Sequence, residues 1–283
     1  MRETNTPTPS SLSGDLKRRV PSAIVLILLA IGATWYGGFP FLLFWTVAAL
    51  IVWYEWATIV DVTPRTNVIA SGAITIVVAA VFLAMNMTGA AVALIFVGAL
   101  GCGFLTNGND RAQIWCGAGL LYASLVFIPA VLLRADVKFG FLAIIWLYAV
   151  VWLTDIGGYF FGRFIGGPKL APVISPKKTW SGAIGGTLFG VLGGVTVASL
   201  ANARVAFMSI VIALMVSLFS QAGDIFESFV KRKFGKKDAS GILPGHGGVM
   251  DRVDGFIAAA ALALLIGLLH RGAAAPATGL LQW

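Results

Sequence analysis

Charged residues are scarce in this sequence. Only 11% of its 283 residues are Asp, Glu, Lys or Arg, whereas 58% are hydrophobic, and the mean hydropathy is +0.90. An ordinary soluble domain is excluded, because a globular fold must cover its core with polar surface. We therefore expect an all-α fold, a polytopic transmembrane helical bundle.

Cysteine and histidine are also rare, with two of each. Cys102 and Cys116 lie in or beside apolar segments without CxxC or metal-ligand spacing, so no disulfide framework is implied. No second His or Cys accompanies His246 to suggest a zinc site. The chain has no convincing internal repeat, which disfavours a transporter built from inverted repeats.

Long apolar runs dominate what is present. A bilayer core about 30 Å thick needs about 20 apolar residues of helix, and this length predicts about nine membrane spans. Their expected ranges are 21–37, 40–60, 67–86, 89–105, 113–133, 139–160, 183–202, 205–223 and 255–270. Within the seventh span, Gly186, Gly190 and Gly194 recur every fourth residue, a spacing typical of helices that pack closely in lipid.

The positive charges are unevenly distributed between the predicted loops. With the N-terminus in the cytoplasm, 16 of the 20 Lys and Arg residues fall on the cytoplasmic side, as the positive-inside rule requires. The net charge of +8 therefore indicates membrane topology and anionic lipid or phosphate partners, and no nucleic acid. We expect a multi-pass protein of the inner (plasma) membrane.

Composition divides the chain into four parts. Residues 1–20, rich in Ser, Thr and Pro, are predicted to be a disordered cytoplasmic tail. Residues 21–136 hold the N-terminal membrane helices, and 137–270 hold the C-terminal helices with two distinctive cytoplasmic loops. Residues 271–283 form a C-terminal tail.

The first distinctive loop spans residues 154–182. Asp155 falls on the inner half of an apolar span, where a carboxylate is expensive unless it faces a cavity, a cation or a partner such as Arg163. Two cationic and two hydroxyl side chains come just before the following span: Ser175, Lys177, Lys178 and Thr179. Backbone N–H groups at that helix start would reinforce anion binding. Glu55, near the inner end of the second span, either lines the same cavity or snorkels to the interface.

The second loop, residues 228–254, is the more specific signal. It concentrates cations, a Gly-rich turn and the acids Asp251 and Asp254, while Asp224 and Glu227 share one helix face just before it. Carboxylates for a divalent cation, cations for phosphate and glycines that admit an anion are together typical of nucleotide phosphate chemistry.

Three segments of this second loop are SFVKR at 228–232, KD at 237–238 and LPGHGGVMDRVD at 243–254. They closely resemble the signature of phosphatidate cytidylyltransferases, also called CDP-diacylglycerol synthases. The segment SPKKTW at 175–180 is similar to a second recurrent segment of that family. Ser181 departs from many members, which carry an acidic residue there.

The resemblance implies transfer of a cytidylyl group from CTP to phosphatidic acid, a membrane lipid. The products are CDP-diacylglycerol and pyrophosphate, and the reaction belongs to phospholipid biosynthesis and depends on Mg²⁺. The resemblance also implies a homodimer. The attacking phosphate is already an anion near neutral pH, so the reaction needs aligned phosphates and neutralised charge more than a general base.

We assign candidate roles on this basis. Asp224 and Asp251 hold the metal, as the matching aspartates of the family do, supported by Asp254 or Glu227. The further catalytic candidates are Asp155, Lys237 and Arg252. The expected substrate-binding residues are Ser175, Lys177, Lys178, Thr179, Lys231, Arg232, Gly245, His246, Gly247 and Gly248. His246 either contacts the nucleotide or holds the loop in place.

Three alternatives remain open. The lipid acceptor could be an isoprenoid ether lipid or another lipid phosphate. An ion-coupled transporter could use Asp155, Asp224 and Asp251 as coupling groups, in which case they should face a pathway at mid-membrane. A non-catalytic scaffold would bind phosphatidic acid without consuming CTP.

Overall fold

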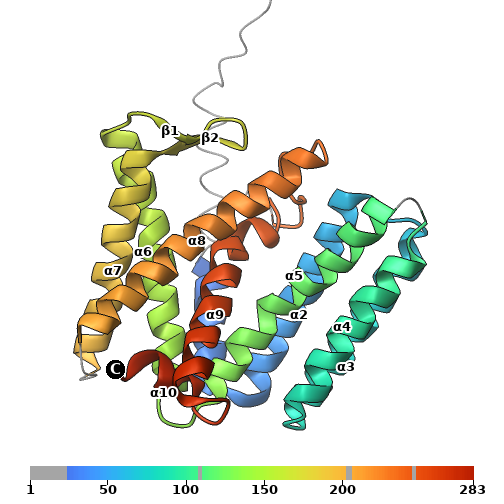
Figure 1. The fold of residues 1–283 in the computed structure, drawn as a ribbon, viewed down its shortest axis with the longest axis horizontal. Helices are drawn as coiled ribbons and strands as arrows, with labels where there is room; N and C mark the ends of the chain where they lie inside the picture. Colours follow the sequence, from blue (N-terminus) through green and yellow to red (C-terminus); the bar gives the residue numbers. More distant parts are fainter. Residues whose placement is uncertain (1–23, 108–109, 202–205, 244–246) are drawn as a thin grey trace, which may run out of the picture.

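The chain is a bundle of helices with one small β-hairpin (Figure 1). A computed structural model describes residues 24–107, 110–201, 206–243 and 247–283. The helices are α2 (Gly38–Val60), α3 (Arg65–Ala84), α4 (Thr88–Leu105), α5 (Asp110–Ala135), α6 (Gly140–Phe164), α7 (Trp180–Leu200), α8 (Phe207–Lys233), α9 (Met250–Arg271) and α10 (Pro276–Leu281). A shorter apolar helix, Ile24–Tyr36, precedes α2.

Eight helices of the described residues, α2 to α9, are long and apolar enough to cross a membrane. They correspond to eight of the nine predicted spans. The first predicted span is described only from residue 24 and contains the shorter helix Ile24–Tyr36. The all-α, multi-pass class is therefore confirmed. The predicted tail, 1–20, lies outside the described residues, and the division into four parts stays a prediction.

Two helices extend well beyond their predicted ends. Helix α8 continues to Lys233, ten residues past the predicted end at 223, and α9 begins at Met250, five residues before the predicted start at 255. Hydropathy marks where contact with lipid ends, whereas backbone hydrogen bonding continues into polar sequence. The acids that we expected at a helix tip and in a loop therefore lie within α8 and in the first turns of α9.

The loop between α6 and α7 contains the hairpin, which the sequence patterns did not predict. Strand β1 (Lys169–Ala171) pairs antiparallel with β2 (Ser175–Thr179), with Lys169 opposite Thr179. Thr179 then caps α7, because its hydroxyl accepts a hydrogen bond from the Gly182 N–H at 3.1 Å. That N–H is consequently satisfied by the protein and is not open to an anion.

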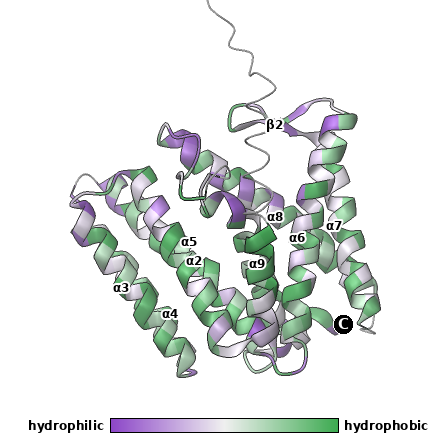
Figure 2. Ribbon diagram, turned by 180° about the vertical axis from the view of Figure 1, so that it is seen from behind, coloured by the Kyte–Doolittle hydropathy of each residue, from purple (hydrophilic) through white to green (hydrophobic). Residues whose placement is uncertain are grey.

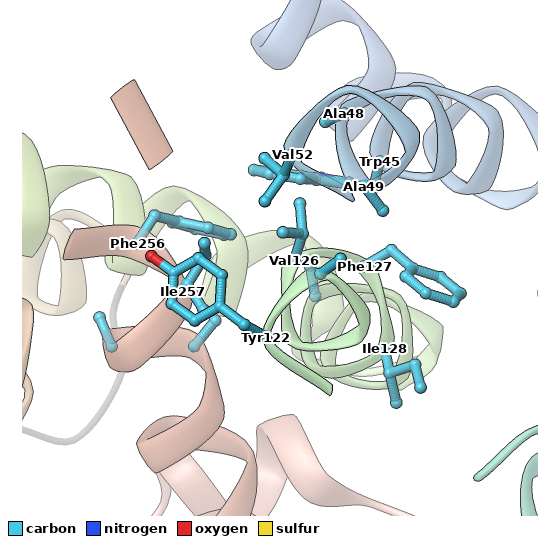
Figure 3. Close-up of a cluster of buried hydrophobic side chains, with 14 of the residues drawn as sticks. Trp45, Ala48, Ala49, Val52, Tyr122, Val126, Phe127, Ile128, Phe256 and Ile257 are labelled. Carbon is cyan, nitrogen blue, oxygen red and sulfur yellow. The ribbon is translucent and has the colours of Figure 1, made fainter. Parts of the chain in front are cut away.

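Part of the hydrophobic core lies between α2, α5 and α9, where Trp45 and Val52 of α2, Val126 of α5 and Phe256 of α9 gather (Figure 3). Trp45 of α2 stacks on Phe256 of α9 with ring centroids 4.6 Å apart. Phe127 of α5 and Ile257 of α9 are almost completely buried. This dense packing gives the first turns of α9 a rigid support.

Helices α6 and α7 approach each other through glycines, as the four-residue spacing predicts. A Cβ atom added at Gly186 would lie 2.5 Å from the Thr154 carbonyl oxygen, and one added at Gly182 would lie 2.7 Å from the Gly158 carbonyl oxygen. Backbone therefore touches backbone, and any side chain would push the helices apart.

Hydropathy changes sharply along the bundle (Figure 2). Hydrophilic residues gather at the end that carries β2 and the C-terminal part of α8, while the long helices are mostly hydrophobic. The short helix α10 lies at the opposite end, near the C-terminus (Figure 1).

Asp136 organises this opposite end. Its carboxylate accepts the Thr278 N–H of α10 at 2.7 Å and the backbone N–H groups of Lys138 and Phe139 at 2.9 and 3.2 Å. Burial by itself raises the pKa of Asp136, but the hydrogen bonds from the backbone and from the Thr278 hydroxyl outweigh it and lower the pKa below the usual value.

The α6–α7 contact predicts opposite effects for two glycine substitutions. Gly186→Ala should lower the free energy of unfolding by about 1–3 kcal/mol, because the new methyl group overpacks the interface. Gly101→Ala on α4 is the matched control, since nothing lies within 4 Å of its added Cβ, and it should be neutral or stabilise by up to about 1 kcal/mol. Unfolding midpoints in detergent measure both. Equal midpoints for the two variants would contradict the packing described.

The lowered pKa of Asp136 predicts that the stability of the protein depends on pH. Because its pKa is lower in the folded than in the unfolded protein, its contribution to stability is present above the unfolded pKa of about 3.9. It is lost as the pH falls through the folded value. Asp136→Asn should lower the free energy of unfolding at neutral pH by about 1.5–3 kcal/mol, and its gap from the wild type should close below pH 4. A gap that stays constant down to pH 2 would contradict this account.

Candidate active site

A cavity of about 880 Å³ opens among α6, β2, α7, α8 and the start of α9. It lies at the polar end of the bundle. Its acidic lining residues are Asp155, Asp224, Glu227, Asp238, Asp251 and Asp254, and its basic ones are Lys177, Lys178, Lys231, Lys237 and Arg252. The structure thus brings the two distinctive segments, which are far apart in the sequence, around one space.

Most of the predicted site residues line this cavity, including Thr179 and Gly247. Ser175 and Arg232 do not: the Arg232 guanidinium is exposed and donates to the Lys236 carbonyl oxygen at 3.3 Å. Gly248 is buried just behind the lining. The predictions for Gly245 and His246 fall outside the described residues.

Lys178 and Asp224 join the two segments directly. The Lys178 ammonium lies 2.6 Å from Asp224 Oδ2, and both side chains are partly exposed to the cavity. Strand β2 positions the lysine and α8 positions the aspartate. A cation and a carboxylate that each keep part of their surface free can still bind a phosphate or a metal.

Lys231 forms the buried centre of the second segment. Its ammonium contacts Glu227 Oε2 at 2.7 Å, one helical turn earlier, and also Asp251 Oδ1. The other oxygen of Asp251 accepts the Gly248 N–H at 2.8 Å and the Ala239 N–H at 3.2 Å. Oε1 of Glu227 is buried without a hydrogen-bond partner among the described residues. One lysine therefore pairs with two acids, and one carboxylate oxygen stays without a partner among the described residues.

Asp155 and Asp254 complete the acidic side. Asp254 accepts the N–H of Gly255 at 2.8 Å and interacts electrostatically with Asp155 and Asp224. The alternative in which Asp155 pairs with Arg163 is not supported, because the Arg163 guanidinium donates to Tyr159 at 2.7 Å. Three carboxylates from α6, α8 and α9 therefore lie within electrostatic range of one another and would attract cations.

The sequence analysis did not predict several of the residues that line the cavity. Tyr159 is four residues after Asp155 on α6, and Gln221 is three residues before Asp224 on α8. Residues three or four positions apart share a helix face, so examining those positions around each aspartate would have predicted both residues. Ser181 does not line the cavity; its hydroxyl donates to the Gly166 carbonyl oxygen and fixes the turn before β1.

Both expectations for Glu55 were wrong. Its side chain neither lines the cavity nor reaches the interface, because it is 0% exposed. Its carboxylate accepts the backbone N–H groups of Val249 at 2.9 Å and Met250 at 2.7 Å, and the Ser240 hydroxyl. Local sequence carries no signal of these contacts, since the partners lie 185 to 195 residues away.

Comparison with known proteins agrees with this geometry. A model of the "Cytidylyltransferase family" matches residues 17–269, which include every described residue of the cavity. The chain belongs to the cytidylyltransferase family. Proteins from Brucella suis and Brucella melitensis named phosphatidate cytidylyltransferase are each 45% identical to it over 258 residues, 90% of this chain and 94% of theirs. A Staphylococcus saprophyticus protein of the same name is 39% identical over 144 residues, 50% of this chain and 54% of its own.

This cytidylyltransferase is therefore an enzyme, a nucleotidyltransferase embedded in a membrane by many helices. The family resemblance in its second loop is confirmed. The transporter and scaffold alternatives gain no support, since the family and the relatives are named for cytidylyltransferase activity and the acids share their cavity with five cationic side chains of the described residues.

The double pairing of Lys231 predicts a large stability effect. Lys231→Met should lower the free energy of unfolding by about 3–5 kcal/mol, because it leaves two buried acids without their cation. Adding Glu227→Gln should restore part of that loss. The matched control is Lys236→Met, whose exposed position should make it neutral within about 0.5 kcal/mol. Chemical unfolding in detergent measures all three; a Lys231→Met protein as stable as the control would contradict the pairing.

Proposed function

We propose that this enzyme transfers the cytidylyl group of CTP to phosphatidic acid and releases CDP-diacylglycerol and pyrophosphate. The observation that carries the proposal is that acids and cations of both family-like segments line one shared cavity. The names of the Brucella relatives, which align over nearly their whole length, support the same substrates.

The chemistry suits these residues. An oxygen of the lipid phosphate attacks the α-phosphorus of CTP, and the bond from that phosphorus to the bridging oxygen of the pyrophosphate breaks. No proton has to move, but two polyanions must approach in line. Five cationic side chains line the cavity and would reduce this repulsion while stabilising charge on the leaving group.

We propose that different cationic side chains bind different phosphate groups. Lys177 and Lys178 on β2 would receive the lipid head group or the leaving group. Lys237 and Arg252 would hold the nucleotide phosphates beside the backbone of Gly247. Arg232 has no place in this scheme because it lies outside the cavity.

We also propose Mg²⁺ as the cofactor, held by Asp224 and Asp251 with support from Asp254 or Glu227. These hard carboxylate oxygens suit the ion, and the buried, unpartnered Oε1 of Glu227 fits a cation nearby. Among the described residues no three His, Cys, Asp or Glu side chains form a metal-binding group by themselves. Mg²⁺ characteristically takes one or two carboxylates and completes its shell with waters and substrate phosphates. When bound, it would neutralise charge on the pyrophosphate.

We propose that the cavity opens at the cytoplasmic face of the inner membrane. The predicted positive-inside topology supports this, and so does the clustering of polar residues at the cavity end (Figure 2). CTP would enter from water, while the acyl chains of phosphatidic acid remain in the bilayer. The homodimer stays a prediction.

The proposal predicts label transfer from CTP labelled at the α-phosphate. Purified enzyme with phosphatidic acid should move the label into the lipid fraction with Mg²⁺ and not with EDTA. Asp224→Asn and Asp251→Asn should each lower the rate at least about 100-fold, and Asp155→Asn should lower it as well.

Asp61→Asn is the matched control. Asp61 is exposed after α2, outside the cavity, and has a φ of 58°, a conformation that Asn also tolerates. Its rate should stay within about twofold of the wild type. Labelled lipid in EDTA, or near-normal turnover in either Asp224→Asn or Asp251→Asn, would overturn the metal assignment. No labelled lipid under any condition would overturn the reaction.

A further inference from the structure

Glu55 is a completely buried acid near the C-terminal end of α2, a mostly apolar helix. Trp53 and Trp56 are also 0% exposed, whereas Tyr54 is 43% exposed, so Glu55 lies on the face of α2 that packs against protein. A carboxylate inside a membrane helix is costly unless partners satisfy it. Among the described residues it has three hydrogen-bond partners, all of them donors and all in the second distinctive segment.

The contacts of Glu55 supply what the start of α9 lacks. Val249 at the N-cap makes no side-chain capping bond, although the first N–H groups of a helix have no partner within the helix. Glu55 accepts the Val249 and Met250 N–H groups with one oxygen each. It therefore caps α9 from α2, and its charge also suits the positive end of the helix dipole.

Two carboxylates together hold both described ends of the loop between α8 and α9. Asp251 accepts the N–H groups of Ala239 and Gly248, and Glu55 accepts the hydroxyl of Ser240 beside the N–H of Val249. The fit is tight, because a Cβ added at Gly248 would lie 2.6 Å from Glu55 Oε1.

The groups that Glu55 holds either line the cavity or directly precede residues that do. Asp251, Arg252 and Asp254 line it from the first turns of α9, and Ser240 lines it from the loop. Helix α2 itself contributes no residue to the lining among the described residues. Glu55 therefore acts from outside the lining, through the α9 start and the loop that it holds.

We propose that Glu55 is a positioning residue for nucleotidyl transfer: from α2 it caps α9 and so sets where the acids of α9 meet the phosphates. The inference rests on the proposed function for its kinetic consequence. Reacting groups tolerate little displacement, since a misplacement of about 1 Å can cost about 100-fold in rate. Glu55 thereby links the N-terminal helices to a site built wholly from the C-terminal half.

Glu55→Gln is the primary test. Gln keeps the size of the side chain but turns an NH₂ donor toward one of the three donors, so at least one contact is lost. At saturating CTP and phosphatidic acid, kcat should fall about 10- to 100-fold, while the KM for CTP should change less than about threefold. In hydrogen–deuterium exchange, the Val249 and Met250 amides should exchange at least about tenfold faster.

Asp136→Asn is the matched control, because Asp136 is also a buried carboxylate that accepts backbone N–H groups at a helix start. It lies at the end of the bundle opposite the cavity. Both variants should lose stability, but Asp136→Asn should keep kcat within about twofold at a temperature where both are folded. Its exchange should rise at Thr278 and not at Met250.

Specific outcomes would overturn the proposal. A Glu55→Gln enzyme with faster exchange and unchanged kcat would show that the cap is purely structural. Unchanged exchange would show that Glu55 does not hold α9. The proposal would also be overturned if kcat fell in proportion to the loss of stability, and by the same proportion, in Glu55→Gln and Asp136→Asn.

Ser240→Ala keeps the proposal testable if Glu55→Gln does not fold. This variant removes one of the three contacts and should give a smaller kcat loss with a smaller rise in exchange at Val249. A wild-type exchange rate at Val249 would count against the proposal. Because exchange is measured without substrate, a wrong lipid acceptor would abolish the assay with phosphatidic acid and leave the exchange result intact, so the two failures are distinguishable.

Discussion

Carboxylates enclosed by membrane helices must each find donors, and here those donors join parts of the chain that are distant in sequence. Glu55 of α2 binds the start of α9, Asp224 of α8 binds Lys178 of β2, and Asp251 of α9 binds Lys231 of α8. Because an unpaired buried charge is so unfavourable, these pairs allow few arrangements of the polar end. The charges to which we assign roles in the reaction also hold the site together.

The rest of the bundle supports this end by close packing. Helices α2, α5 and α9 share an apolar core, against which α9 packs (Figure 3). Helices α6 and α7 touch through glycine backbones, which brings Asp155 of α6 near the lysines before α7. A rigid frame of this kind suits a reaction between two polyanions, since the protein must hold phosphates in line rather than move protons.

Much of the site could be predicted because its signals are local. Charged residues stand out in an apolar sequence, so Asp155, Asp224 and the 228–254 segment were recognisable from the sequence alone. Helical spacing correctly placed Asp224 and Glu227 on one face. The predicted helix ends were wrong where they relied on hydropathy alone, because α8 and α9 continue as helices into polar sequence.

By itself the sequence determined the membrane class, eight of the spans, the family and most of the side chains that line the cavity, since hydropathy, period and motif are properties of neighbouring residues. Only the tertiary structure decided the rest: that Lys231 serves two acids, that Arg232 points away, and that Glu55 caps a helix 195 residues later. Such contacts depend on how distant helices pack, and short-range patterns in the chain do not encode them.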